Sequence, residues 1–267
     1  MKKLGVIATL LFTSVFSCIK NADAHLRTYA FTEEYRTIPQ GNMEVEQWTT
    51  FNVPDGSKTS ENSIQYQTEL EYGLMDHLTI ANYERWKTNN VEGEDDSTNY
   101  EGFKFETKYR IGEKGKYWVD PLIYLEWKTD PREHEHHNEL EAKLILSKDF
   151  GAFNVVYNHI GEWELARDGR ANHEFSVATS YEVLPAFRIG TEFTGDYWAH
   201  GSRMNALRLG PTIGWESKYF WIVAGALFGL NRVADDHEVR LIVGVPFPFD
   251  IGSFLNKKTE SAVNNLK

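Results

Sequence analysis

The stretch QYQTELEYGLMDHLTIANYERW (Gln65–Trp86) decides the fold of this chain. Apolar or aromatic residues alternate with polar ones up to Met75-Asp76, and the alternation resumes after this two-residue turn. Alternation on both sides of so short a connection predicts an antiparallel hairpin. Each arm has about ten residues, whereas strands of globular proteins commonly have about five or six. The sequence therefore predicts unusually long strands with one apolar face and one acidic face.

Similar alternating runs continue along the chain, and no amphipathic helix of useful length interrupts them. In one of them Phe103, Phe105 and Tyr109 alternate with charged residues such as Lys104 and Glu106. Period-two alternation of this kind is typical of strands that have one polar face. Twelve strands are predicted, near residues 43–53, 64–74, 77–88, 99–110, 117–128, 137–148, 151–164, 172–183, 186–197, 203–215, 218–230 and 237–249.

The connections between the predicted strands alternate in length. They are mostly tight after even-numbered strands, as at Met75-Asp76 and Leu184-Pro185, and longer and more polar after odd-numbered strands, as at 54–63 and 129–136. Short turns at one end and long loops at the other are typical of bacterial outer-membrane barrels. A tilted strand of about 9–11 residues crosses a bilayer. We therefore predict an all-β fold, a transmembrane antiparallel up-and-down β-barrel of about 12 strands over residues 43–249.

Aromatic residues collect near both ends of the predicted strands, where membrane interfaces hold them. The turn side has Tyr72, Tyr109, Tyr117, Phe153, Tyr181, Phe187, Trp215 and Tyr219, and the loop side has Tyr83, Trp86, Tyr100, Trp127, Trp163 and Tyr197. A soluble exported β-sandwich or small barrel is the alternative, since alternation does not say which face points out. Two departures stand out: Trp48 is in phase with Glu44 and Glu46, and residues 219–230 are apolar on both faces. A bulge or a plugged, packed lumen explains either.

The first residues have the pattern of an export signal. Lys2 and Lys3 precede an apolar run over 4–16, and Ala22-Asp23-Ala24 supplies a small-residue cleavage site. This pattern predicts a secretory signal peptide over residues 1–24. The only cysteine, Cys18, lies inside it, so lipidation of Cys18 stays open as an alternative. Residues 25–42 are predicted to form an N-terminal periplasmic or lumen segment, and residues 250–267 a polar C-terminal tail.

Two motifs resemble those of known proteins. YGLMDHLTI (72–80) is similar to the tight periplasmic turn of Gram-negative outer-membrane barrels, and IVGVPFPF (242–249) resembles the barrel-assembly signal of their last strand. Gly244, Phe247 and Phe249 match that signal, whereas Ile242 stands at a position that is usually polar. The chain thus resembles a Gram-negative outer-membrane β-barrel protein of an uncharacterised, porin-like family. The resemblance implies insertion in the cell outer membrane and contact with outer-membrane lipid and the outer-membrane assembly machinery.

Charged residues of both signs occupy the phase that a barrel would turn inward. Such residues either set the ion and solute preference of a pore or pair across neighbouring strands and fill the interior. The candidates for lining the lumen are Glu69, Glu71, Lys104, Glu106, Lys108, Arg110, Glu139, Glu141, Arg188, Glu192, Arg208 and Arg240.

Other chemistry has weak support in the sequence. The loop DPREHEHHNELE (130–141) contains His134, His136 and His137, whose imidazoles suit Zn²⁺ or Cu²⁺, but no standard ligand spacing is present. No Gly-x-Ser-x-Gly or His-Glu-x-x-His motif occurs, so catalytic residues are not assigned and neither an enzyme nor a cofactor is expected. The net charge of −11 argues against nucleic acid as a partner.

Two functions follow from these observations. The first is a passive channel or transporter for ions or small solutes. The second is a non-conducting outer-membrane barrel with a binding, structural or surface-hydrolase role. If the barrel conducts, the acidic loop over 92–96 predicts a weak cation preference, because it would concentrate cations near the external mouth.

Overall fold

The computed structural model describes residues 27–58, 60–93, 97–130, 137–166, 169–198 and 204–249. The predicted signal peptide over 1–24, with Cys18, and the predicted tail over 250–267 lie outside these residues. Among the described residues, no helix is long and apolar enough to cross a membrane.

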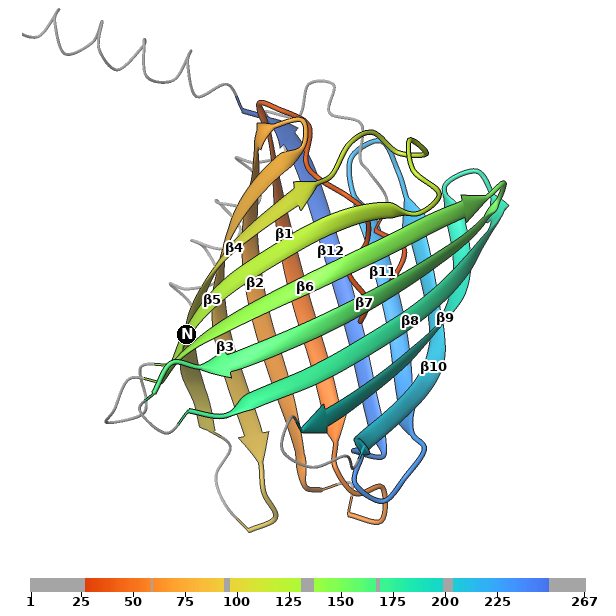
Figure 1. Ribbon diagram of the computed structural model, residues 1–267. Coiled ribbons are helices and arrows are strands. Elements are labelled where there is room, and N and C mark those ends of the chain that lie inside the picture. The colour runs from red at the N-terminus through yellow and green to blue at the C-terminus, as the bar shows by residue number, and fades with distance from the viewer. Residues whose placement is uncertain are drawn as a thin grey trace, which may run out of the picture.

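Twelve antiparallel strands make up the fold, as the sequence predicted (Figure 1). Every predicted strand is present, and most of the predicted ends lie within two residues of the observed ones. The strands are β1 (Asn42–Val53), β2 (Asn62–Met75), β3 (Leu78–Asn90), β4 (Ser97–Arg110), β5 (Asp120–Asp130), β6 (His137–Phe150), β7 (Phe153–Glu164), β8 (Ala171–Leu184), β9 (Phe187–Trp198), β10 (Met204–Glu216), β11 (Trp221–Gly229) and β12 (His237–Pro248).

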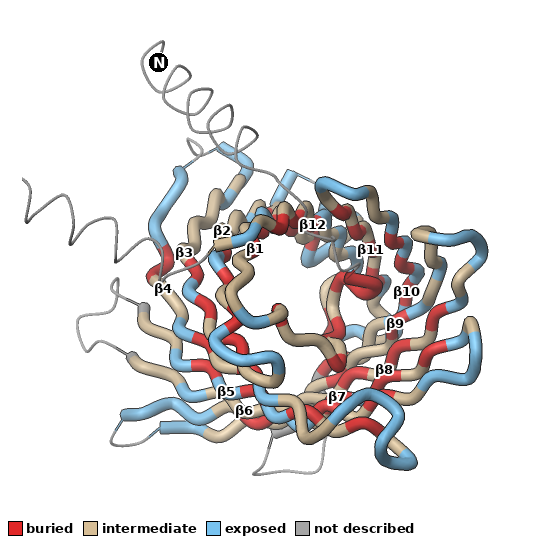
Figure 2. Tube along the Cα trace, turned by 90° about the horizontal axis from the view of Figure 1, so that it is seen from above, coloured by how far each residue is buried: buried red, intermediate tan, exposed pale blue. Residues whose placement is uncertain are grey.

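The sheet closes on itself. Each strand pairs with its neighbours in sequence, and β1 pairs with β12 over the full length of both strands, from Asn42 opposite Pro248 to Val53 opposite His237. Seen from above, the strands form a complete ring (Figure 2). Closure leaves no unpaired strand edge, which is the condition for a sheet to cross a bilayer.

The two faces of the sheet differ in the way that the alternation predicts. Large apolar side chains of one phase point outward, and Phe105 and Ile189 are each 46% exposed. The other phase is covered, and the carboxylates of Glu106 and Glu192 are fully buried. A soluble sandwich would bury the apolar face, so that alternative is wrong. The outward face is instead suited to lipid.

Most of the predicted interfacial aromatics are on the outward face, including Tyr109, Tyr181 and Trp215, which are exposed. Tyr83 is an exception. Its side chain is buried inside the barrel, where its hydroxyl donates a hydrogen bond to Glu106. The prediction that Tyr83 belongs to the loop-side aromatic belt is therefore wrong, because Tyr83 has the same phase as Thr79 and Ala81, which are buried on the inner face of β3.

Residues 27–41 form no strand, and their side chains pack against inward-pointing residues from both sides of the ring. We call these residues the internal segment; it is the orange-red coil inside the barrel of Figure 1. Tyr29 and Tyr35 pack with buried residues of β5 to β8 such as Leu122 and Ile145. At its end Gly41 donates to the carbonyl of Gly73 before the chain enters β1.

The internal segment explains the sequence positions that break the alternation. Ala30 and Phe31 pack on an apolar cluster in the lumen that is formed by Trp48, Trp221, Val223 and Ile242. Trp48 is the tryptophan that stands in phase with Glu44 and Glu46. Trp221 and Val223 belong to the run that is apolar on both faces, and Ile242 is the apolar residue in the last-strand signal. An inner wall that faced only water would have no reason to be apolar at these positions. The wall is apolar where the chain itself covers it.

Candidate functional site

The inner face of β1 and β2 is strongly acidic. Glu44 lies directly opposite Glu71 in the strand register, and Glu46 lies opposite Glu69. Like charges directly across a strand pair repel each other. All four side chains are also buried, where water cannot screen the repulsion. This wall therefore needs positive charge from elsewhere in the chain.

Arg36 of the internal segment supplies part of that charge. Its Nη2 lies 2.5 Å from Glu44 Oε1, 3.0 Å from Glu46 Oε1 and 3.2 Å from Glu71 Oε2. Burial opposes the charged form of Arg36, but Glu44 and the other carboxylates raise its pKa above the ordinary value for arginine. The guanidinium thus stays charged and ties the segment to β1 and β2.

Arg27 and Glu33 extend the network from the other end of the segment. Arg27 Nη2 donates to Glu33 Oε1 at 2.7 Å, and its guanidinium carbon lies 4.4 Å from the centre of the Trp48 ring. Lys108 Nζ on β4 lies 3.6 Å from Glu33 and 2.9 Å from each of Glu71 and Glu106. Burial would raise the pKa of Glu33, but Arg27 and Lys108 hold that pKa well below the ordinary value.

Backbone groups of the segment also find partners on the wall. The amides of Ala30 and Phe31 each donate at 2.8 Å to one oxygen of Glu192 on β9. The amide of Ile38 donates to Thr79 on β3 at 2.7 Å. Because irregular backbone in a lumen must satisfy its own polar groups, these contacts fix the segment across the barrel.

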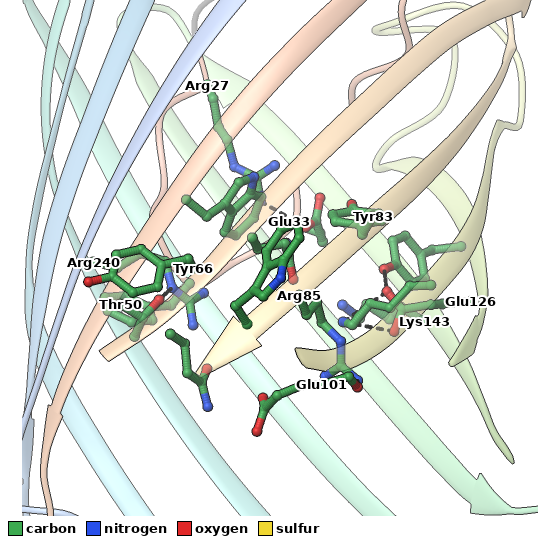
Figure 3. Close-up of a pocket in the computed structure, with 17 residues that line it drawn as sticks. Arg27, Glu33, Thr50, Tyr66, Tyr83, Arg85, Glu101, Glu126, Lys143 and Arg240 are labelled. Atoms are coloured by element: carbon green, nitrogen blue, oxygen red, sulfur yellow. Dashed lines mark hydrogen bonds and ion pairs between the residues drawn. The ribbon is translucent and has the colours of Figure 1, made fainter. Parts of the chain in front are cut away.

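A cavity of about 190 Å³ lies on the loop side of the internal segment. Arg27 and Glu33 of the segment, together with Arg85, Lys143 and Arg240 of the wall, extend toward it (Figure 3). Its other charged side chains are Lys104, Glu101 and Glu126, and aromatic residues complete the lining. The lining therefore has five basic groups and three carboxylates, and two of the basic groups, Lys143 and Arg240, also pair with Glu141 and Glu238 beside the cavity.

A second cavity, of about 440 Å³, lies on the turn side of the segment. Its lining combines Glu34 and Arg36 with Arg110, Asn154 and Arg188 from the wall. Arg188 is held by Glu182, the residue opposite it on β8, at 2.6 Å. The internal segment thus separates two polar spaces in the same barrel.

The predicted lumen-lining residues belong to the phase opposite to the exposed apolar side chains, but the structure brings only some of them together. Glu69, Glu71, Glu106 and Lys108 form one buried cluster. Glu192 is also buried but lies apart, beneath Ala30 and Phe31. The others are half-buried around the ring: Lys104, Arg110, Glu139, Glu141, Arg188, Arg208 and Arg240.

Several residues of the site were not predicted. Arg27, Glu33 and Arg36 lie in the stretch before the first strand, where no periodicity indicates what they contact. The signal that could have found them is the pairing of Glu44 and Glu46 with glutamates of the next strand, since such a pairing requires nearby cations.

The loop with the histidines that suit a metal lies mostly outside the described residues. His134 and His136 lie outside the described residues, and for His137 only the backbone is described, at the start of β6.

Comparisons with known proteins give the fold. No family model matches the chain, and no curated protein matches it. An outer-membrane channel from Pseudomonas putida F1 has a TM-score of 0.58 at 11% identity, over 81% of this chain and 99% of the other. The NanC porin has a TM-score of 0.51 at 12% identity, over 77% and 98%. The transport unit of the autotransporter AIDA-I from Escherichia coli has a TM-score of 0.50 at 12% identity, over 82% and 94%. The chain therefore has the fold of outer-membrane β-barrels such as porins.

Proposed function

We propose that this protein is an outer-membrane channel for ions or small solutes, whose bore is narrowed by its own internal segment. The observation that carries the proposal is the position of residues 27–41 between two polar cavities of one closed barrel. The outward apolar face suits a bilayer, and the similar structures include a channel and a porin. None of the similar structures named above is described as an enzyme, in keeping with the absence of catalytic motifs.

The charges around the loop-side cavity suggest which solutes pass. Arg85, Lys104 and Arg240 lie on the wall of this cavity beside Arg27 and Lys143, against three carboxylates. Charged rings at a constriction set selectivity more strongly than charges at a wide mouth, because the ion passes closer to them. We therefore expect small anions to be preferred, in contrast to the cation preference that the acidic outer loop predicts.

Single-channel recording in planar bilayers tests the proposal. Discrete conductance steps are expected, with a reversal potential in a salt gradient that indicates anion preference. Arg85→Ala and Lys104→Ala should reduce this preference. Arg188→Ala should change it less, because Arg188 lies beside the wider cavity on the other side of the segment.

A disulfide tests whether the segment must move. The Cβ of Ala30 lies 2.7 Å from the position of a Cβ on Gly225, so cysteines at these two positions can be joined after a small displacement. In a chain that carries Cys18→Ser, the oxidised Ala30→Cys/Gly225→Cys variant should conduct less than the same protein after reduction. Equal conductance would show that solutes pass beside a fixed segment. The absence of any steps in every form would instead favour the non-conducting alternative.

A further inference from the structure

The acidic cluster on the inner wall holds more negative charge than its partners balance. Glu33, Glu44, Glu46, Glu69, Glu71 and Glu106 are all buried. The ion pairs of these residues involve only Arg27, Arg36 and Lys108 among the described residues. Six carboxylates thus share three cations. Uncompensated buried charges are strongly destabilising, so the cluster requires further positive charge.

Among these six carboxylates, Glu69 has the fewest polar partners. Its side chain is fully buried between Glu46 of β1 and Tyr83 of β3, which are its register partners. Neither of its carboxylate oxygens accepts a hydrogen bond from any described residue, and none of the described ion pairs includes it. Both oxygens are therefore available as ligands in the middle of the cluster.

The neighbouring carboxylates are placed to share a ligand with Glu69. One oxygen from each of Glu69, Glu71 and Glu106 lies within 4.8 Å of the other two. Calcium binds oxygen at about 2.3–2.6 Å, so ligands on opposite sides of the ion are up to about 5 Å apart. Magnesium needs shorter distances of about 2.0–2.1 Å and a stricter octahedron. Oxygens within 4.8 Å of one another are therefore close enough to share a calcium-sized ion.

Lys108 does not exclude such an ion. Its Nζ lies 2.9 Å from Glu71 Oε1 and 2.9 Å from Glu106 Oε1. Each carboxylate oxygen has two lone pairs and can contact an ammonium and a metal ion together. Of the three carboxylates, only Glu69 is in no ion pair with Lys108 among the described residues, so the ion would not share its oxygens with the ammonium.

We propose that Glu69, Glu71 and Glu106 bind a divalent cation of the size of calcium. The ion joins β2 to β4 across β3 and relieves the repulsion among the carboxylates that hold Arg36. It therefore stabilises the barrel together with its internal segment. This site is distinct from the histidine loop that the sequence indicated, and it does not depend on whether the barrel conducts.

Calcium titration of the purified, chelator-treated full-length protein in detergent tests the site. Isothermal titration calorimetry should give one tight site per barrel, and the Tm should rise by several degrees with calcium and less with magnesium. Glu69→Gln should weaken calcium binding by at least about tenfold and remove the shift in Tm. Glu238→Gln is the matched control, because Glu238 is a lumen carboxylate paired with Arg240 outside the cluster. It should leave calcium binding unchanged.

Two results would overturn the proposal. If the wild-type protein shows neither binding nor a Tm shift at millimolar calcium, the cluster is balanced by protons instead. If Glu69→Gln keeps the wild-type response, the ion binds elsewhere, for example at the acidic loops. Should Glu69→Gln fail to fold, terbium luminescence of the wild-type protein decides. Tyrosine-sensitised emission that calcium displaces at one equivalent supports the site near Tyr83, and its absence overturns it.

Discussion

The inner surface of the barrel has two walls that balance their charges differently. On β5 to β10 the partners are local: Lys128 lies 2.7 Å from Glu139 on the next strand, and Arg188 lies 2.6 Å from Glu182. Glutamates also face glutamates on this wall, since Glu126 lies opposite Glu141 and Glu141 lies opposite Glu162. On β1 and β2 glutamates face glutamates too, but most of their positive partners come from a segment outside the sheet. The first wall takes its cations from the sheet itself. The second wall takes most of its cations from the internal segment.

This difference suggests how the segment finds its position. Where lysines and arginines of the sheet already pair with carboxylates, as Lys128 and Arg188 do, the wall offers less to an incoming arginine. A wall of unbalanced carboxylates attracts Arg27 and Arg36 strongly, since low dielectric strengthens the interaction. Charge on the sheet therefore specifies where the chain folds back, much as an apolar stripe specifies where a helix packs.

The largest effect is expected at Arg36. Arg36→Ala would leave Glu44, Glu46 and Glu71 without their shared guanidinium, and breaking a buried ion pair from one side costs about 3–5 kcal/mol. The free energy of unfolding, measured by urea titration in lipid vesicles, should fall by that amount. Arg188→Ala removes an arginine from the other wall, whose partner Glu182 is 39% exposed, and should cost about 0–1 kcal/mol. Equal losses would mean that the two walls do not differ in the way described.

Next in size are substitutions on the lipid face, which should not distinguish the walls. Phe105→Arg on β4 and Ile189→Arg on β9 each place a charge among outward apolar side chains that are 46% exposed. Near the bilayer midplane each should cost about 2–4 kcal/mol in the same unfolding measurement. A large difference between the two variants would indicate that the walls differ outside as well as inside.

Most of the barrel could be predicted because its determinants are local. Alternation is a property of neighbouring residues, and so is a turn such as Met75-Asp76, so the strands and their order follow without knowledge of distant contacts. The inner packing is non-local: Tyr29 donates to Asn154, a residue 125 positions away. No pattern near Tyr29 contains that information. The departures at Trp48 and over 219–230 left a plugged lumen open beside a bulge, but gave no indication of which part of the chain would cover the wall.

A glycine on the acidic wall offers a test of how closely the internal segment packs. A Cβ on Gly73 would lie 2.2 Å from the carbonyl oxygen of Pro39 and 2.4 Å from that of Ile38. Since backbone cannot move aside cheaply, Gly73→Ala should cost about 1–3 kcal/mol. For Gly161→Ala on β7 the nearest atoms belong to the end of the partly exposed Trp163 ring, which can shift, so this variant should cost less. If Gly73→Ala has no effect, the segment does not lie against β2 in solution.

The smallest effect is expected for the pH dependence of the stability. It concerns Glu33 and Glu34, two adjacent carboxylates of the internal segment. Glu33 contacts Arg27 and Lys108, which lower its pKa despite burial. None of the described ion pairs includes Glu34, and burial raises the pKa of Glu34 above its ordinary value of 4.5. A raised pKa in the folded state means that ionising Glu34 destabilises the fold. This destabilisation is therefore absent below about pH 4.5. It grows as the pH rises above that value and is complete once the pH has passed the higher folded-state pKa.

Glu34→Gln removes this titration and keeps an oxygen that can accept the hydrogen bond from the amide of Thr28. The variant should gain stability relative to the wild type as the pH rises from 4.5 toward 8, while the other buried carboxylates cancel in the comparison. Unfolding titrations of both proteins across this range give the difference directly. A difference that does not change with pH would mean that water reaches Glu34 through the turn-side cavity. The opposite slope would mean that the Thr28 amide and nearby arginines outweigh burial, so that both carboxylates of the segment would be held in the same way as Glu33.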